Sequence, residues 1–350
     1  MLERLHIRNY RVFNDLKIDH LSRINLIAGK NNSGKTSLLE AIFLLSGAGN
    51  AQMAMNPNII RGLEPGAEVP QTIGQTFWKQ LFSELDMSSA VKIAGLYTSL
   101  GQLALEIAVE RPPITELPLD RTGRISMTNL PDQRSLIFQY SDPLGKKSEG
   151  RIHVKGQGIE IRQGNREVPF AARILQSRTG NAQDDATLLG MLRKQKQGEV
   201  LLEALQIIEP KLRSIEDNSA SGTSMIWGDI GLPELIPLSA MGEGMTRIAR
   251  LVLAISSVPS GVALADEIEN GLHYSVLPKV WKVVDATAKQ FNTQVFATTH
   301  SFECIEAAHE ALGADDFRLH RLEVSGTENR CVTYEPEAIS AALKHDLEIR

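Results

Sequence analysis

The sequence of 350 residues contains only two cysteines, Cys304 and Cys331, and few aromatic side chains, which make up 5% of the residues. Two cysteines exclude a scaffold built on several disulfides and argue against a cysteine-based zinc site. We therefore expect both thiols to be small buried side chains of a protein in a reducing compartment. Because aromatic residues are scarce, aliphatic side chains must fill most of the core.

Long hydrophobic stretches and an excess of basic residues are also missing. The longest apolar runs, AIFLLSGAG and LVLAIS, fall short of the roughly 20 residues that cross a bilayer. The first residues, MLERLHIRNYRVF, carry charges throughout, unlike a signal peptide. With a formal net charge of −5, nucleic acid would have to be met by a local patch or by a partner protein. The sequence thus predicts a soluble, cytoplasmic protein with no membrane segment.

The pattern of apolar residues changes along the chain. The chain begins with a predicted strand pair, followed by the buried strand INLIAG and a helix. Near the end of the chain two buried strands, GVALA and TQVFAT, are each followed by a helix. Short alternating runs between residues 90 and 175 predict antiparallel strands, and residues 184–216 predict helix broken once, at Pro210. We expect an α/β fold with its core at 1–75 and 236–350, an antiparallel β-rich part at 76–175 and a helical lid at 176–235.

The segment GKNNSGKT matches the P-loop pattern G-x-x-x-x-G-K-[ST] at every fixed position. It follows a predicted buried strand and opens a predicted helix, which is the context that a P-loop requires. In such a loop the backbone N–H groups and the helix N-terminus surround phosphate oxygens, the lysine contacts the β and γ phosphates, and the hydroxyl binds Mg²⁺. We therefore predict ATP and Mg²⁺ as cofactors, bound by Gly29, Asn31, Asn32, Ser33, Gly34, Lys35, Thr36 and Ser37.

Two later strands also end in polar residues. The buried strand in VALADEIENGLH ends with Asp266 and Glu267, and a carboxylate there is costly unless something pairs with it. We expect Asp266 to bind Mg²⁺ and Glu267 to orient or deprotonate a water; the alternative is a solvated acidic turn. His300 follows the strand in VFATTHS, at the edge where α/β sheets bind ligands. We predict that His300 contacts the γ phosphate, against the alternative of a structural histidine.

A glycine-rich loop, LSAMGEG, precedes an amphipathic helix that lies before the Asp-Glu strand. The order of P-loop, insertion, glycine-rich helix start, Asp-Glu strand and His strand resembles that of an ABC-type ATPase head. LSAMGEG resembles the ABC signature loop, with one residue more than L-S-G-G-[QE]. The opening LHIRNYRVF and GKNNSGKTSLLEAI are similar to SMC and RecF heads, whereas LSAMGEGMTRI, DEIENGLHYSVL and QVFATTHS are similar to AAA15/OLD-like ATPases.

This resemblance implies how the loop works and adds site residues. In an ABC head the signature loop meets the nucleotide of a second subunit, so two heads should pair face to face on ATP. Arg11 would contact a nucleotide phosphate, unless it is an ordinary surface arginine. Gln176 in RILQSR would begin the lid and sense Mg²⁺. Further contacts to nucleotide are implied for Ser239, Gly242, Glu243, Gly244, Asn270 and His273.

The resemblance also implies a slow ATPase that switches a partner in a prokaryotic cell. OLD proteins carry a TOPRIM nuclease, whose Asp-x-Asp pair this sequence lacks. We therefore expect a sensor or regulator of a separately encoded nuclease or toxin in anti-phage defence. The alternatives are a RecF-like DNA-repair ATPase that loads partner proteins on DNA and a transporter subunit, which the SMC-like opening disfavours. The basic run at residues 193–196 is a solvated helix face or a patch for nucleic acid.

Overall fold

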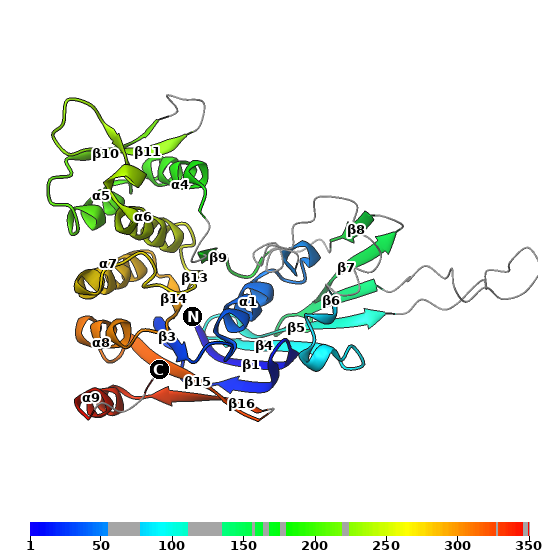
Figure 1. The fold of residues 1–350 in the computed structure, drawn as a ribbon. Helices are drawn as coiled ribbons and strands as arrows, with labels where there is room; N and C mark the ends of the chain where they lie inside the picture. The colour runs from blue at the N-terminus through cyan, green and yellow to red at the C-terminus, as the bar shows by residue number, and fades with distance from the viewer. Residues whose placement is uncertain are drawn as a thin grey trace, which may run out of the picture.

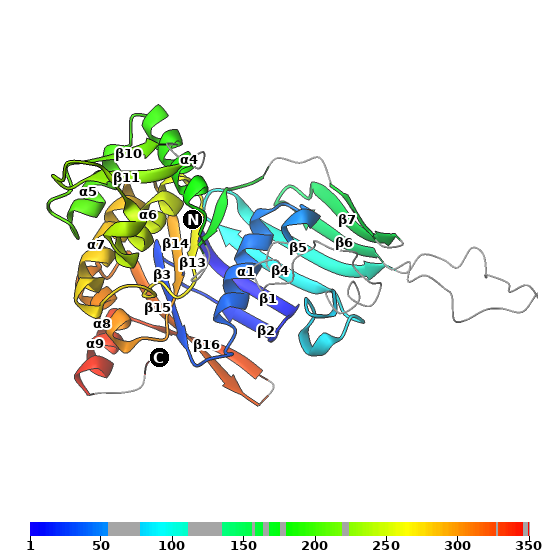
Figure 2. The ribbon, with the colours of Figure 1, turned by 45° about the horizontal axis from the view of Figure 1, so that its top comes forward.

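The structure is a computed structural model that describes residues 1–54, 78–110, 135–155, 158–163, 168–175, 180–218, 224–326, 328–345 and 349. In this part of the chain two large sheets enclose helix α1 (Lys35–Ser46), and a small sheet lies in the lid (Figures 1 and 2). Part of the region predicted to form antiparallel strands, residues 111–134, lies outside the described residues, and so does Gln176. None of the described helices is long and apolar enough to cross a bilayer.

The six-stranded sheet has the order β16-β15-β3-β14-β13-β9, and its neighbours are parallel except for β15 and β16. Three of its strands are buried along their whole length, as parallel strands covered on both faces should be. The predicted buried strands INLIAG, GVALA and TQVFAT are confirmed. The strands are β3 (Ile24–Gly29), β9 (Ala172–Leu175), β13 (Val262–Ala265), β14 (Gln294–Thr298), β15 (Phe317–Ser325) and β16 (Glu328–Tyr334).

The seven-stranded sheet is antiparallel throughout, in the order β2-β1-β4-β5-β6-β7-β8. It contains the predicted N-terminal strand pair, because β1 also pairs with β4, so the boundary expected at residue 75 runs through one sheet. The strands are β1 (Leu2–Tyr10), β2 (Phe13–Ile18), β4 (Val91–Tyr97), β5 (Gly101–Glu110), β6 (Ser135–Ser141), β7 (Lys147–Lys155) and β8 (Gly158–Arg162).

One strand of the region expected to be antiparallel belongs elsewhere. β9 pairs in parallel with β13, with Ala172 beside Val262 and Leu175 beside Ala265, and it forms an edge of the six-stranded sheet. Assigning β9 to the antiparallel part was therefore wrong. Four residues are too few for an apolar pattern to show which sheet a strand joins, because that choice depends on contacts distant in the sequence.

Helix α1 is buried on all sides from residue 37 to residue 46. Its apolar side chains share one core with the inner face of the antiparallel sheet and with Ile27 and Phe296 of the parallel sheet. Alternate residues of the same strands, such as Leu26 and Ala297, face a second core on the other side. Helices α6 (Glu243–Ser256), α7 (Leu277–Gln290), α8 (Phe302–Ala311) and α9 (Pro336–Lys344) cover that side (Figure 1).

The lid is mixed rather than purely helical. Helix α4 (Ala182–Lys194) ends before the turn at Gly198, which lies against Arg193, and α5 (Glu199–Gln206) follows. The predicted single break at Pro210 is therefore wrong, because a turn with Lys196 at a φ of 60° interrupts the helix earlier and residues 214–216 are already strand. A three-stranded sheet completes the lid, formed by β10 (Ser214–Asn218), β11 (Met225–Asp229) and β12 (Ile236–Pro237).

Both cysteines are free thiols, as expected from their number. Cys304 is buried in α8 and Cys331 is half-buried in β16. Burial raises the pKa of each thiol to about 12, so the reactive thiolate is scarce at neutral pH.

An ion pair lies inside the molecule beneath the P-loop. Arg11 Nε is 2.7 Å from Glu40 Oε2 on α1, and the two side chains are 4% and 0% exposed. Tyr10 Oη accepts a second hydrogen bond from Arg11 Nε, at 3.1 Å. The alternative of a surface arginine is therefore wrong. A phosphate contact by Arg11 stays a prediction, and it would require the guanidinium to share or exchange these partners.

Replacing Glu40 with Ala should lower the free energy of unfolding by about 3–5 kcal/mol, because it removes the carboxylate that compensates a buried guanidinium. The double variant Arg11→Met/Glu40→Leu removes both charges and should recover most of that loss. Urea unfolding followed by tryptophan fluorescence measures both effects. The same unfolding midpoint for Glu40→Ala and wild type would contradict the prediction.

Candidate active site

The P-loop connects the carboxyl end of β3 to α1. Gly34, at the helix N-cap, has a φ of 100°, and a Cβ there would lie 2.6 Å from the Phe13 ring, so only glycine fits. Lys35 Nζ donates to the carbonyls of Gly29 at 2.6 Å and Lys30 at 3.0 Å. Ser33 Oγ is buried without a hydrogen-bond partner, which a phosphate oxygen would supply.

The other residues of the loop divide by exposure. Asn31 and Asn32 are exposed at its tip, and Ser37 is buried in the first turn of α1. That first turn contains no acidic residue, so the N-terminus of α1 keeps its favourable field for an anion. The loop thus combines a helix N-terminus, the Lys35 ammonium and the unpaired Ser33 hydroxyl.

Asp266 follows β13 and connects this loop to the neighbouring strand. Thr36 Oγ1 lies 3.1 and 3.3 Å from the two carboxylate oxygens of Asp266, and Thr298 Oγ1 donates to Oδ1 at 2.6 Å. A hydroxyl facing a carboxylate supplies the oxygen ligands that Mg²⁺ prefers when phosphates complete its shell. The described residues include no group of three or more His, Cys, Asp or Glu that could hold a metal ion unaided. The donor set therefore fits a cation shared with a nucleotide.

Glu267 has an unusual backbone. Its φ of 45° lies in the left-handed region, which disfavours every residue other than glycine. Thr298 Oγ1 accepts a hydrogen bond from its N–H at 2.8 Å, and Asn270 Nδ2 donates to its Oε2 at 2.5 Å. The carboxylate is thus held in one direction at the end of β13. Asn270, expected at the nucleotide, contacts Glu267 of its own chain.

His300 lies past the end of β14, where its side chain is 51% exposed. Its Nδ1 is 3.6 Å from Glu269 Oε1, which also accepts from Thr299 Oγ1 at 2.8 Å and from the His300 N–H at 3.1 Å. Glu269 therefore fixes the loop that carries His300. Sequence reasoning missed this carboxylate and both threonines, although the third acidic residue in DEIEN and the TT before His300 were visible signals.

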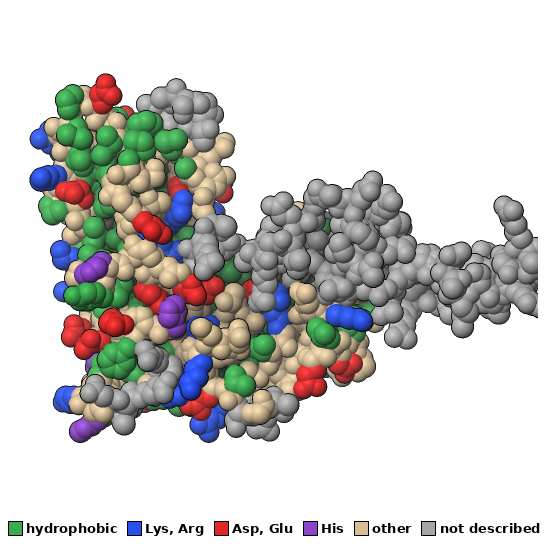
Figure 3. Space-filling view, in the orientation of Figure 1, with side chains coloured by type: hydrophobic (Ala, Val, Ile, Leu, Met, Phe, Trp, Pro, Cys, Tyr) green, Lys and Arg blue, Asp and Glu red, His purple; other side chains and the backbone are tan. Residues whose placement is uncertain are grey.

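Carboxylates also set the electrostatics of the loop. Burial lowers the pKa of Lys35, and Asp266, Glu267 and Glu269 oppose that shift by raising it. In the space-filling view, acidic side chains and a histidine gather near the middle of one face, in the region where Figure 1 labels β13 and β14 (Figure 3). A nucleotide at this edge would need a cation to offset its own negative charge.

The glycine-rich loop forms a short turn, Leu238–Met241, followed by α6. Gly242 has a φ of 114° at the helix N-cap, and a Cβ there would meet no atom within 4 Å, so this helix start is open to solvent. A Cβ on Gly244 would make only ordinary contacts, at 3.6 Å, with the carbonyl of Gly271 and with Leu272. The fold of the single chain therefore does not require glycine at position 244.

The remaining expected contacts lie near this helix start. Ser239 and Glu243 are exposed, and the side chain of Glu243 lies against Gly271. His273 is exposed as well, and its Nδ1 lies 2.9 Å from Ser275 Oγ in the turn before α7. The structure brings together Lys35, Thr36, Asp266, Glu267, Asn270 and His300, whereas Arg11 lies inside the molecule.

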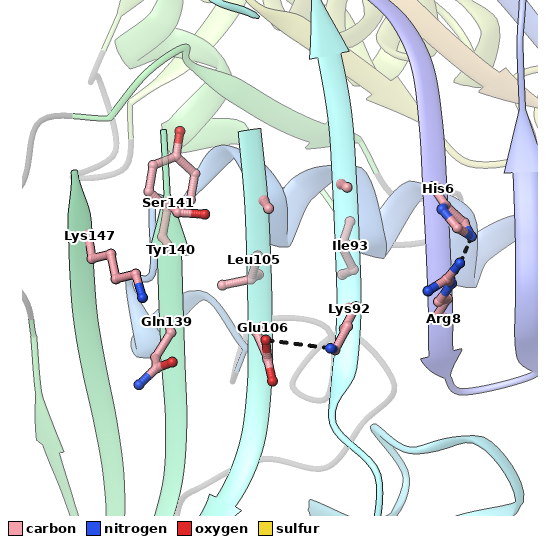
Figure 4. Close-up of a pocket in the computed structure, with 12 residues that line it drawn as sticks. His6, Arg8, Lys92, Ile93, Leu105, Glu106, Gln139, Tyr140, Ser141 and Lys147 are labelled. Carbon is pink, nitrogen blue, oxygen red and sulfur yellow. Dashed lines mark hydrogen bonds and ion pairs between the residues drawn. The ribbon is translucent and has the colours of Figure 1, made fainter. Parts of the chain in front are cut away.

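A second concave region lies on the outer face of the antiparallel sheet (Figure 4). Ala94 and Ala104 pair across β4 and β5 and form the floor of a depression of about 230 Å³. His6, Lys92 and Lys147 stand at its rim. The depression contains none of the P-loop or Asp-Glu residues, so it is separate from the nucleotide site.

Comparison with known proteins agrees with this geometry. The family model of the AAA ATPase domain matches residues 1–95, and that described as "AAA domain, putative AbiEii toxin, Type IV TA system" matches residues 144–306. A protein of Helicobacter pylori named ATP/GTP phosphatase is 26% identical over 343 residues, which cover 91% of this chain and 90% of that protein. RecF of Tropheryma whipplei is 36% identical over 73 residues, only 21% of this chain and 20% of RecF.

Among solved structures, the chain is similar to an Smc head domain of Pyrococcus furiosus, determined with the C-terminal domain of ScpA. The TM-score is 0.51 at 12% identity, and the alignment covers 99% of each chain. At this identity the similarity shows the fold alone. Fold and motifs together define an ABC-type ATPase head.

The chain is an ATPase, as the P-loop and the two matching ATPase-domain models indicate. The predicted fold class and ATPase activity are confirmed, and the family models agree with the predicted resemblance to AAA15 ATPases. The roles of the individual site residues stay predictions.

Lys35→Ala should bind ATP at least about tenfold more weakly, because it removes the point charge from the β and γ phosphates. Isothermal titration calorimetry with ATP measures the loss. Lys30→Ala is the matched control, since Lys30 is exposed in the same loop and offers the site only its carbonyl. Equal affinity of wild type and Lys35→Ala would remove the basis for placing phosphate in this loop.

Proposed function

We propose that this ATPase depends on Mg²⁺, pairs head to head on ATP, and regulates a separately encoded effector, a nuclease or a toxin, in prokaryotic anti-phage defence. The observation that carries the catalytic part is the junction of Thr36, Asp266 and Glu267 at one sheet edge. A hydroxyl, a cation-binding carboxylate and an oriented second carboxylate are what phosphoryl transfer to water requires.

Each residue of this edge has a distinct task in the proposed reaction. Lys35 would leave its loop carbonyls and contact the β and γ phosphates. Thr36 and Asp266 would hold Mg²⁺, which when bound neutralises phosphate charge. Glu267, fixed by Asn270, would orient the attacking water and accept its proton. His300 would reach the γ phosphate from its exposed position after β14.

Pairing of heads is supported by the start of α6. Gly242 leaves an open helix N-terminus, whose N–H groups and dipole favour an anion, whereas the exposed Glu243 in the first turn opposes it. In this proposal the chain's own P-loop holds its own nucleotide, and the fold of one chain does not require glycine at position 244. A second head placed face to face would bring this helix start to its partner's γ phosphate and create two composite sites.

Exposed apolar side chains near the same helix support an interface there. Leu232 is 53% exposed before the glycine-rich loop, and Tyr274 is 66% exposed after the Asp-Glu loop. The space-filling view shows hydrophobic side chains over the lid on this side of the molecule (Figure 3). Such surface is typical of a contact with another protein.

The role in defence draws support from one comparison. The family description that matches residues 144–306 names a putative toxin of a type IV toxin–antitoxin system. This chain has no Asp-x-Asp pair for a nuclease of its own, so the proposal assigns the effector to another gene.

A RecF-like function is the second candidate, and the outer sheet face favours it. The basic side chains Arg8, Lys92 and Lys147 line the depression of the antiparallel sheet, where Glu106 pairs with Lys92 (Figure 4). Such a local patch could meet DNA phosphates if Lys92 exchanges this partner. The basic run at residues 193–196 of the lid is the other local patch, and its Arg193 is likewise paired, with Asp217.

Glu267→Gln should bind ATP like wild type and lose turnover, because an amide cannot accept the proton of the attacking water. ATP should therefore accumulate on paired heads, since it binds the pair better than the separate heads. Phosphate release measures turnover, and light scattering with and without ATP measures mass. Wild-type turnover in this variant would remove Glu267 from the mechanism.

Position 244 supplies the matched control for pairing. In the Glu267→Gln background, Gly244→Trp should abolish the ATP-dependent mass increase and leave ATP affinity unchanged, because Trp would block the approach of a partner. Gly244→Ala should fold normally, since its Cβ has room and alanine favours helix by about 1 kcal/mol. Monomers under all conditions, with an active wild type, would contradict the pairing.

Affinity purification of tagged Glu267→Gln from its native cells in the presence of ATP separates the two cellular roles. We expect one stoichiometric partner with nuclease or toxin activity, absent when Gly244→Trp is the bait. DNA that co-purifies without such a partner, and is lost in Lys92→Glu/Lys147→Glu, would instead support the RecF-like function.

A further inference from the structure

Arg247 occupies an unexpected place for a charged residue. It lies in α6 one turn after Gly244, and only 6% of its surface is exposed. Burial and the neighbouring Arg250 lower the pKa of Arg247, against the opposing effect of Asp266 and nearby glutamates. A buried guanidinium is expensive to desolvate, so a role beyond packing is expected for it.

The guanidinium binds backbone at the end of β13. Arg247 Nη2 donates to the main-chain carbonyls of Asp266 at 2.8 Å and of Glu267 at 2.9 Å. In an extended strand consecutive carbonyls point to opposite sides. The left-handed φ of 45° at Glu267 is what turns both toward one donor. Arg247 therefore stabilises the disfavoured backbone that aims the Glu267 carboxylate.

The start of α6 and the loop after β13 also touch at a second place. The Glu243 side chain lies within 2.9 Å of where a Cβ on Gly271 would be, and the Gly271 carbonyl lies 3.6 Å from such an atom on Gly244. Asn270 of the same loop holds the Glu267 carboxylate. The N-terminus of α6 is thus packed against the loop that orients Glu267.

We propose that Arg247 couples the two composite sites of a pair: docking of the α6 N-terminus on the partner's nucleotide, transmitted through Arg247, sets the orientation of Glu267 in the same chain. The proposal rests on the head-to-head pairing proposed above. Arg247 is a positioning residue, because its guanidinium binds carbonyls of its own chain. Hydrolysis at one site then depends on nucleotide at the other.

Arg247→Met tests this coupling with readouts that separate it from ATP binding and from pairing. We expect an ATP dissociation constant within about threefold of wild type, since the P-loop is untouched. In the Glu267→Gln background the variant should still pair on ATP. Its kcat should fall at least about tenfold with little change in KM. The activity per head of wild type should rise with protein concentration as pairs form, and that of Arg247→Met should stay flat.

Two further variants control for the shape of α6. Arg250→Met removes another arginine of the same helix, whose partner is Asp185 of the lid at 2.8 Å, and should keep kcat within about twofold of wild type. Arg247→Lys offers one ammonium in place of the guanidinium fork, so kcat should fall at least about threefold with pairing intact. If Arg247→Met does not fold, Arg247→Lys decides, and wild-type kcat in it would overturn the proposal.

The outcomes distinguish the two proposals. If Glu267→Gln stays monomeric with ATP, the pairing fails and the coupling with it. If pairs form and the activity of Arg247→Met rises with concentration as in wild type, only the coupling is overturned. If kcat falls only in proportion to lost pairing, Arg247 merely shapes α6, and the coupling is likewise overturned.

Discussion

The Asp266 carboxylate is the point on which the rest of the site depends. It accepts hydrogen bonds from Thr36 of the P-loop helix and from Thr298 of β14, and Asp266 itself directly follows the last residue of β13. These groups meet because the three strands are parallel and in register, with Ala265 beside Ala297 and Thr298 beside Ile27. Parallel strands present their carboxyl ends at one edge, so segments distant in the sequence contribute to one place.

Much of this edge could be predicted from local sequence. GKNNSGKT contains its own strand-loop-helix context, and the strands before Asp266 and His300 are short apolar runs that only a fully covered sheet can bury. The start of α6 just after the first glycine of LSAMGEG was visible for the same reason. In each case the physical cause acts within a few residues of the motif.

What escaped prediction depends on pairs distant in the sequence. Glu40 sits in an apolar helix, and only the fold shows that it faces Arg11. From the sequence, Arg247 is predicted to be an ordinary polar residue of an amphipathic helix. Only the fold shows that its guanidinium contacts the backbone after β13. The edge strand β9 and the lid sheet likewise depend on partners that no local pattern specifies.

The complete burial of α1 has a mechanical consequence. Packed between two sheets from residue 37 to residue 46, this helix has no free face along which it could slide or tilt without opening a close-packed interior. The part of the molecule that contains α1 and the P-loop is therefore rigid. A conformational change that follows ATP binding would have to occur in parts with an exposed side, which are the lid and the N-terminal end of α6. An effector that responds to the bound nucleotide would have to contact the molecule there.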